Sequence, residues 1–227
     1  MEPATSLRKA DRPTRKRRSD GERSRAAILD EAARLATVEG IQGISIGRLA
    51  DAVGMSKSGL FAHFGSKEEL QLATVGAARD VFAREVTAPA AEAPSGLERL
   101  RGLTGGFLRY VADDTFPGGC FFASVLAEVD MQPGPVRDEL VTFLGEWVRL
   151  IEAAVRDAQA EGALEPTEDP AQLTFELEAA LLLANMQYVV SRSAEPIERA
   201  RTAIDRRLAT AGARPVNRRV ARSSSGR

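Results

Sequence analysis

Residues 45–64 read Ser45-Ile-Gly-Arg-Leu-Ala-Asp-Ala-Val-Gly-Met-Ser-Lys-Ser-Gly-Leu-Phe-Ala-His-Phe64. This stretch predicts two short helices, because Ser45 and Ser56 are favourable N-cap residues and Gly54 is a favourable C-cap. Helices shorter than about 12 residues are marginal in isolation, so both must pack on something. A tight turn at Gly54-Met55 is typical of a helix-turn-helix, whose second helix enters the DNA major groove. Caps and apolar spacing alone are equally compatible with an ordinary helical hairpin.

The second helix of this pair is expected to have a buried side and a DNA-facing side. Leu60 and Phe64 lie four residues apart and predict the buried side. The other faces carry Lys57, Ser58, Phe61 and Ala62. A lysine can donate to guanine O6 and N7 or to a phosphate, and a serine hydroxyl can bond either. Gly59 permits close approach to a groove wall but reads no base.

The segment from Ile44 to Leu70 closely resembles the DNA-binding signature of the TetR/AcrR family of transcriptional regulators. The upstream residues that also match are Ile28, Ala32, Ala33, Leu35 and Gly40. The resemblance covers about Arg25 to Leu72. Beyond it, the residues around Gly119-Cys120, Trp147 and Gly162-Ala163-Leu164 resemble one C-terminal variant of the family. The resemblance implies an N-terminal helix-turn-helix domain followed by a helical ligand-binding and dimerisation domain.

The resemblance also implies roles for individual side chains. Ser45, His63 and Lys67 stand where the family has phosphate-contacting residues, although a lone histidine is more often structural or simply exposed. Phe61 replaces the more frequent tyrosine, and Ser58-Gly59 replaces the common Gly-Thr/Ser pair, so the base-reading residues differ from the usual pattern. The expected DNA-binding residues are Ser45, Ser56, Lys57, Ser58, Gly59, Phe61, Ala62, His63 and Lys67.

The rest of the chain predicts an all-α fold of about nine helices. A capping box at Ser19 and Glu22 predicts the start of the first helix, and a second one at Ser66 and Glu69 opens a helix that reaches about Val86. Residues 89–96 read as a connector, followed by helices over about 97–112, 121–130, 136–159, 171–191 and 196–211. The expected divisions are a disordered basic arm (1–18), the helix-turn-helix domain (19–66), the regulatory and dimerisation domain (67–212) and a disordered basic tail (213–227).

Charge is distributed unevenly along the chain, although the net charge is only −1. Residues 1–25 carry nine basic and four acidic groups, and residues 214–227 carry five arginines and no acid. The remaining segment therefore has a balance of −11. Basic ends of this kind can serve as solubilising tails or can contact phosphates, and the sequence leaves both open.

The regulatory segment is rich in apolar helical stripes. Residues 173–184 are apolar nearly all round, which favours a homodimer, and the resemblance implies pairing through the last two long helices. The residues expected to line an effector cavity are Phe107, Tyr110, Phe121, Phe143, Trp147 and Met186, each of which could equally fill the core. Few charges intersperse them, which favours a largely apolar effector. Cys120 is a candidate thiol sensor, with a buried structural cysteine as the alternative.

Other functional classes find little support in the sequence. One histidine and one cysteine provide no metal cluster and no catalytic dyad, and no nucleotide-binding glycine motif occurs, so neither an enzyme nor a cofactor is expected. The absence of a long apolar segment, of a secretory signal and of paired cysteines favours a cytoplasmic protein without a membrane partner. The expected partners are double-stranded DNA with a palindromic operator, a second copy of the chain and a small effector. An architectural DNA-binding protein without a ligand is the alternative.

Overall fold

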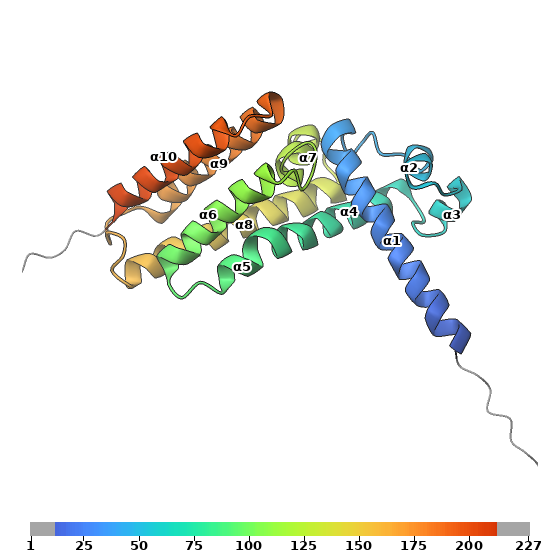
Figure 1. Cartoon of the computed structure of the whole chain (residues 1–227), viewed down its shortest axis with the longest axis horizontal. Helices are drawn as coiled ribbons and strands as arrows, with labels where there is room; N and C mark the ends of the chain where they lie inside the picture. Colours follow the sequence, from blue (N-terminus) through green and yellow to red (C-terminus); the bar gives the residue numbers. More distant parts are fainter. Residues whose placement is uncertain (1–11, 213–227) are drawn as a thin grey trace, which may run out of the picture.

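A computed structural model describes residues 12–212 of the chain, with side chains from residue 21 onward. Within this range the protein is all-helical, and its one extended contact is an isolated bridge between Leu164 and Gly212. The chain forms a small head at one end and a larger helical body, and the long first helix projects from their junction (Figure 1). The predicted all-α class is confirmed. The predictions for residues 1–11 and 213–227 lie outside the described residues.

The head consists of α1 (Arg12–Glu39), α2 (Ile46–Val53) and α3 (Lys57–Phe61). Both short helices begin at the predicted serines: the Ser45 hydroxyl accepts a hydrogen bond from Arg48 N at 3.1 Å, and the Ser56 hydroxyl accepts one from Gly59 N at 3.1 Å. Gly54 ends α2 with φ +67°, a left-handed conformation that glycine adopts without steric cost. The tight turn that this allows sets α3 against α2.

The first helix begins earlier than expected. α1 starts at Arg12 and runs through Ser19 without a break, so the predicted helix start at Ser19 is wrong, and so is the prediction of disorder for residues 12–18. Arginine and lysine are good helix formers, and a proline in the first turn leaves no hydrogen bond unmade. The basic composition of residues 12–18 suggested disorder, but the same residues are compatible with a helix.

A single helical rod connects the head to the body. It comprises α4 (Lys67–Phe82), the π-helical turn η1 (Ala83–Thr87) and α5 (Ala88–Ala91). The predicted connector at residues 89–96 is therefore wrong over its first half. Pro89 cannot donate to the carbonyl four residues earlier, and its ring crowds that carbonyl. The wider π turn immediately before it accommodates the proline, so the rod continues instead of ending.

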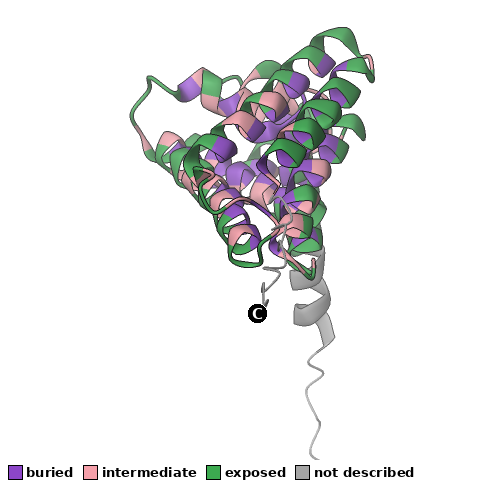
Figure 2. Ribbon diagram, turned by 90° about the vertical axis from the view of Figure 1, so that its left-hand side faces the viewer, coloured by how far each residue is buried: buried purple, intermediate pink, exposed green. Residues whose placement is uncertain are grey.

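The body is built from α6 (Gly96–Ala112), α7 (Phe121–Val129), α8 (Pro135–Ala160), α9 (Pro170–Ser191) and α10 (Glu195–Ala211). Each agrees with its predicted helix to within one residue at both ends. The buried residues lie between the helices, while the outer faces are exposed (Figure 2). α9 and α10 pack side by side on one flank, joined by ion pairs from Arg207 to Glu168 and Glu176.

The start of α6 approaches α8 so closely that only glycine fits. A Cβ at Gly96 would lie 2.3 Å from Ala158 N, whereas a Cβ at Gly105 on the same helix would meet nothing within 4 Å. Gly96 N also donates to the Glu161 carboxylate at 2.9 Å. An alanine is therefore excluded at Gly96 but has space at Gly105.

We expect Gly96→Ala to lower the free energy of unfolding by about 1–3 kcal/mol, because α6 and α8 must separate. Gly105→Ala is the matched control and should raise it by about 0.5–1 kcal/mol, because alanine is the better helix former. Urea unfolding of both variants at one protein concentration measures the difference. Equal effects would contradict the close packing at Gly96.

Candidate DNA-binding face and ligand cavity

The surface of α3 presents the residues that sequence analysis expected to read DNA. Lys57, Ser58 and Ala62 are exposed, Gly59 and His63 are half-buried, and Leu60 and Phe64 are buried beneath them. Phe61 is 53% exposed on the same helix. α3 therefore presents a polar cation, a hydroxyl and an apolar ring on its outer side, the three contact types that base edges and thymine methyl groups accept.

Two further expected residues frame α3. Ser45 is exposed at the start of α2, and Ser56 at the start of α3, where both hydroxyls cap helices. Lys57 extends toward α2, since a Cβ on Gly47 would lie 3.2 Å from its Cε. That glycine leaves the lysine room to lie between the two helices, a neighbour that sequence reasoning did not identify.

Lys67, the ninth expected residue, is exposed at the start of α4 and binds the loop between α1 and α2. Its Nζ donates to the carbonyl of Gln42 at 2.6 Å. A lysine ammonium has three donors, so two remain for a phosphate. The Gln71 amide on the same helix donates to the carbonyl of Ile41 at 2.8 Å and is buried. α4 therefore binds two carbonyls of this loop, those of Ile41 and Gln42.

The same loop is held from the body by α7. The Glu128 carboxylate accepts hydrogen bonds from the backbone N–H groups of Ile41, at 2.6 Å, and Gln42, at 2.8 Å. Nearby, Gly118 N donates to the Thr37 hydroxyl of α1 at 3.1 Å. No motif in the sequence marked Glu128, because its partners are backbone groups 86 and 87 residues away.

The other end of α4 inserts Phe82 into an aromatic cluster. Its ring makes edge-to-face contacts with Phe143 and Trp147, both with centroids 5.2 Å away, and with Tyr110 at 5.5 Å. The helix is also fixed to α8 by Arg79, which pairs with Glu139 at 2.7 Å and Glu146 at 2.5 Å. α4 therefore connects the head directly to the interior of the body.

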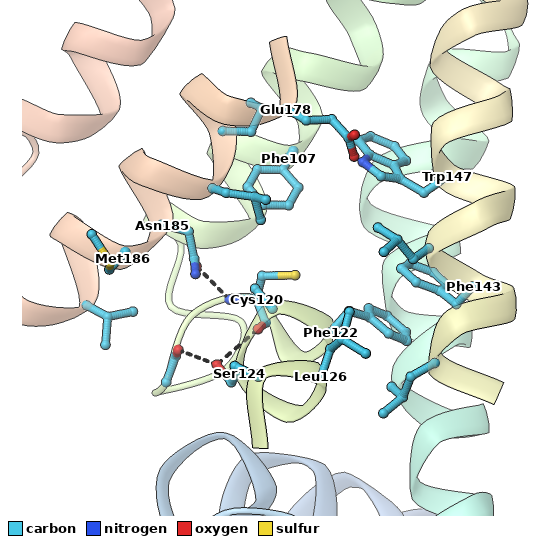
Figure 3. Close-up of a pocket in the computed structure, with 18 of the residues that line it drawn as sticks. Phe107, Cys120, Phe122, Ser124, Leu126, Phe143, Trp147, Glu178, Asn185 and Met186 are labelled. Carbon is cyan, nitrogen blue, oxygen red and sulfur yellow. Dashed lines mark hydrogen bonds between the residues drawn. The ribbon is translucent and has the colours of Figure 1, made fainter. Parts of the chain in front are cut away.

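This interior contains an open cavity of about 630 Å³ between α6, α7, α8 and α9 (Figure 3). Of the residues expected to line an effector cavity, Phe107, Phe143, Trp147 and Met186 line it. Tyr110 and Phe121 are buried in the core and do not line the cavity, and the Tyr110 hydroxyl accepts a hydrogen bond from Phe121 N at 3.4 Å. Phe122 also lines the cavity, and the lining residues that sequence analysis did not identify include Phe82, Cys120, Glu178 and Asn185.

Most polar side chains of the cavity wall are already hydrogen-bonded. Asn185 Oδ1 accepts from Cys120 N at 2.7 Å, and the Ser124 hydroxyl bonds the carbonyls of Gly118 and Cys120 (Figure 3). The Glu178 carboxylate is hydrogen-bonded to the Trp147 side chain, whose indole N–H is the donor. Burial raises the pKa of Glu178, and this hydrogen bond opposes the shift.

Cys120 lies at the N-cap position of α7 and borders the cavity. Burial raises the pKa of its thiol to about 11, against a smaller lowering by the backbone N–H groups of Ala123 and Phe122. A position at a helix start lowers the pKa of a thiol, but here desolvation of the thiolate is the larger effect. At neutral pH the side chain is a protonated, buried thiol.

No helix within residues 12–212 is long and apolar enough to cross a membrane.

Two family models match the chain. Residues 28–74 match the model for bacterial regulatory proteins of the tetR family, and residues 96–204 match the model for the tetracyclin repressor-like C-terminal domain. No curated protein sequence matches the chain significantly.

Solved structures of similar fold cover nearly the same span. A TetR transcriptional regulator from Chloroflexus aurantiacus is 25% identical, with a TM-score of 0.79 over 86% of this chain and 98% of that chain. A TetR-family regulator from Streptomyces coelicolor is 19% identical, with a TM-score of 0.72 over 85% and 96%. The regulator AibR, solved with isovaleryl coenzyme A and operator DNA, is 24% identical, with a TM-score of 0.63 over 82% and 97%.

We expect the Cys120 thiol to react with iodoacetamide at pH 8 at about one-hundredth of the rate in the urea-unfolded chain, because its pKa is raised from 9.0 to about 11. The rate should keep rising up to about pH 11. Since folding disfavours the thiolate, the stability that the thiol contributes is present below pH 9 and is lost as the pH rises toward 11. Equal rates in folded and unfolded protein at pH 8 would instead support a thiol sensor.

Proposed function

Since this chain belongs to the tetR family of DNA-binding transcriptional regulators, we propose that it is a repressor which a small, largely apolar effector releases from a palindromic operator. The observation that carries the proposal is that one helix, α4, connects the head to the cavity. It begins beside the DNA-reading helix at Lys67 and ends at Phe82 in the wall of the cavity. One rigid element therefore joins the two sites that a ligand-controlled repressor needs.

The head supports sequence-specific recognition by α3. Lys57, Ser58 and Phe61 are the proposed base-edge and methyl contacts, because they are exposed together on the helix. Ser45, Ser56, Ala62, His63 and Lys67 are the proposed residues that position the head on phosphates and sugars, with Gly59 leaving room for the groove wall. In a complex of this kind, phosphate contacts fix the register and base contacts fix the sequence.

The cavity supports control by a ligand. A molecule that fills the space beside Phe82 displaces the end of α4, because the ring is enclosed by Phe143, Trp147 and Tyr110. Lys67 at the start of the rod then moves with the head relative to the body. The solved AibR complex contains both a ligand and operator DNA, which supports the same division of roles, although its ligand is not carried over to this chain.

An exposed apolar stripe on α9 supports a homodimer. Phe175 is 68% exposed and Leu183 is 50% exposed, and further large apolar side chains follow along the same helix at Leu182, Met186 and Val190. A second copy of the chain placed across this stripe and α10 would bury it. Two heads in one dimer would then read two half-sites about 34–36 Å apart, or a multiple of one helical turn.

The proposal is tested by selecting bound sequences from a random DNA pool with the purified protein, and then footprinting the enriched site with and without ligands. A two-fold symmetric site that a cavity ligand releases is the expected result. Weak sequence preference without release would overturn the proposal and favour an architectural DNA-binding protein.

We expect Lys57→Ala to relax sequence preference, with a loss of about 1–3 kcal/mol on the preferred site and little on others, because a base-edge donor is removed. Lys67→Ala is the comparison: it should weaken binding to all sequences alike and reduce the salt slope by about one per subunit. Fluorescence anisotropy over a salt series, with the preferred site and a scrambled site, separates the two. If both variants lose affinity uniformly, Lys57 contacts phosphate only.

We expect the double variant Phe175→Glu/Leu183→Glu to raise the dimer dissociation constant by more than about 100-fold, because each buried charge costs several kcal/mol. Met131→Glu is the control, since Met131 is 86% exposed and lies in the turn between α7 and α8. Sedimentation velocity at micromolar concentration gives the oligomeric state. A double variant that stays dimeric would place the interface elsewhere.

A further inference from the structure

The charged groups of the cavity wall are all of one sign. Among the described lining residues, the ionisable side chains other than Cys120 are the carboxylates of Glu178 and Asp130, and none is lysine, arginine or histidine. Arg79 lies over the Phe143 ring, with its Cζ 5.9 Å from the ring centroid, but it is already paired with two glutamates of α8. The wall therefore offers no counter-charge to an anionic ligand.

Glu178 is the carboxylate inside this wall. It is half-buried on α9, lies beside the Trp147 indole (Figure 3), and takes part in no salt bridge among the described residues. A carboxylate has about four acceptor positions, so one hydrogen bond leaves most of them unused. Desolvation of an unpaired carboxylate is costly, and a bound cation offsets that cost.

The surroundings of Glu178 also suit a cation that carries apolar groups. The rings of Phe107 and Trp147 lie with centroids 6.3 Å apart in a stacked arrangement, and Phe82, Phe122 and Phe143 complete an aromatic wall. Aromatic faces attract cations, tryptophan most strongly, and the attraction grows when the site is desolvated. Most of the remaining lining is aliphatic, and the Asn185 and Ser124 side chains are already hydrogen-bonded, so the rest of the ligand is expected to be apolar.

We propose that this cavity selects lipophilic cations: amines, quaternary ammonium or phosphonium ions whose charge lies against Glu178 among the aromatic rings. The inference deepens the proposed function, on which it rests for the role of the cavity as the effector site. The inference restricts the proposed effector class from largely apolar molecules to those that also carry a positive charge. It excludes carboxylate and phosphate ligands of the same size.

Tetraphenylphosphonium and tetraphenylborate provide the test, because they have nearly the same size and shape but opposite charge. Binding to the full-length protein is measured by titration calorimetry and by the fluorescence of Trp147, the single tryptophan of the chain. We expect the cation to bind at least about 10-fold more tightly than the anion. Equal affinity, tighter binding of the anion, or binding of neither ion would overturn the inference.

Glu178→Gln tests the residue, since glutamine keeps the size and removes the charge. It should reduce the preference for the cation by about 10-fold, whereas Glu92→Gln, which removes one exposed charge in the loop before α6, should leave it unchanged. An unaltered preference in Glu178→Gln would overturn the assignment.

Operator release is scored separately from ligand binding. A cation that binds through Glu178 but leaves the operator complex intact would count against ligand-controlled release and not against the charge preference. An operator complex that responds to a neutral or anionic ligand, with no cation preference, would keep the proposed function and overturn the inference.

Discussion

The peptide groups of Ile41 and Gln42 are bound from two sides, and the placement of the head depends on these bonds. Their N–H groups donate to Glu128 of α7, and their carbonyls accept from Gln71 and Lys67 of α4. A loop normally satisfies such groups with water, so four bonds to side chains of two other helices fix it in place. The loop connects α1 to α2, so its fixation helps to set the direction in which α3 points.

Both helices that hold the loop also form walls of the cavity. α4 contributes Phe82 at its far end, and α7 contributes Phe122 and Leu126, which point into the cavity (Figure 3). α7 contacts both the loop and the cavity. α4 contacts the loop near its start and the cavity at its far end. A change in the cavity that moves either helix necessarily moves atoms bonded to the loop.

The sequence predicted the local features of the fold and missed those that depend on distant contacts. The caps at Ser45, Ser56 and Ser66 could be predicted because a hydroxyl and the N–H groups it binds lie within three residues. The π turn before Pro89 could not, because a proline usually indicates a break, whereas here the wider turn lets the rod continue. The pairing of Glu128 with a loop more than 80 residues away leaves no periodic signal at all.

The periodicity of apolar residues does not distinguish side chains that fill the core from those that line the cavity. Phe121 and Phe122 are neighbours on α7, so their side chains point about 100° apart and meet different surroundings. The sequence favoured Phe121, but the structure buries Phe121 in the core and places Phe122 on the cavity wall, stacked on Phe143. An apolar stripe identifies which helix faces are covered, but the line between core and cavity depends on how five helices meet.

The strength of the loop contacts limits how a ligand could act. Hydrogen bonds to charged groups contribute about 1.5–3 kcal/mol each, and three of the four bonds involve Glu128 or Lys67. The bonds to Gln42 contribute less than this because that residue is exposed. Breaking all four bonds still costs more free energy than the roughly 1–3 kcal/mol by which an effector typically couples to a second site. A ligand is therefore expected to leave the bonds intact and to rotate the head together with α4 and the end of α7. Because the two recognition helices of a dimer must match a rigid DNA spacing, a small rotation of this kind is sufficient to lower the affinity for an operator.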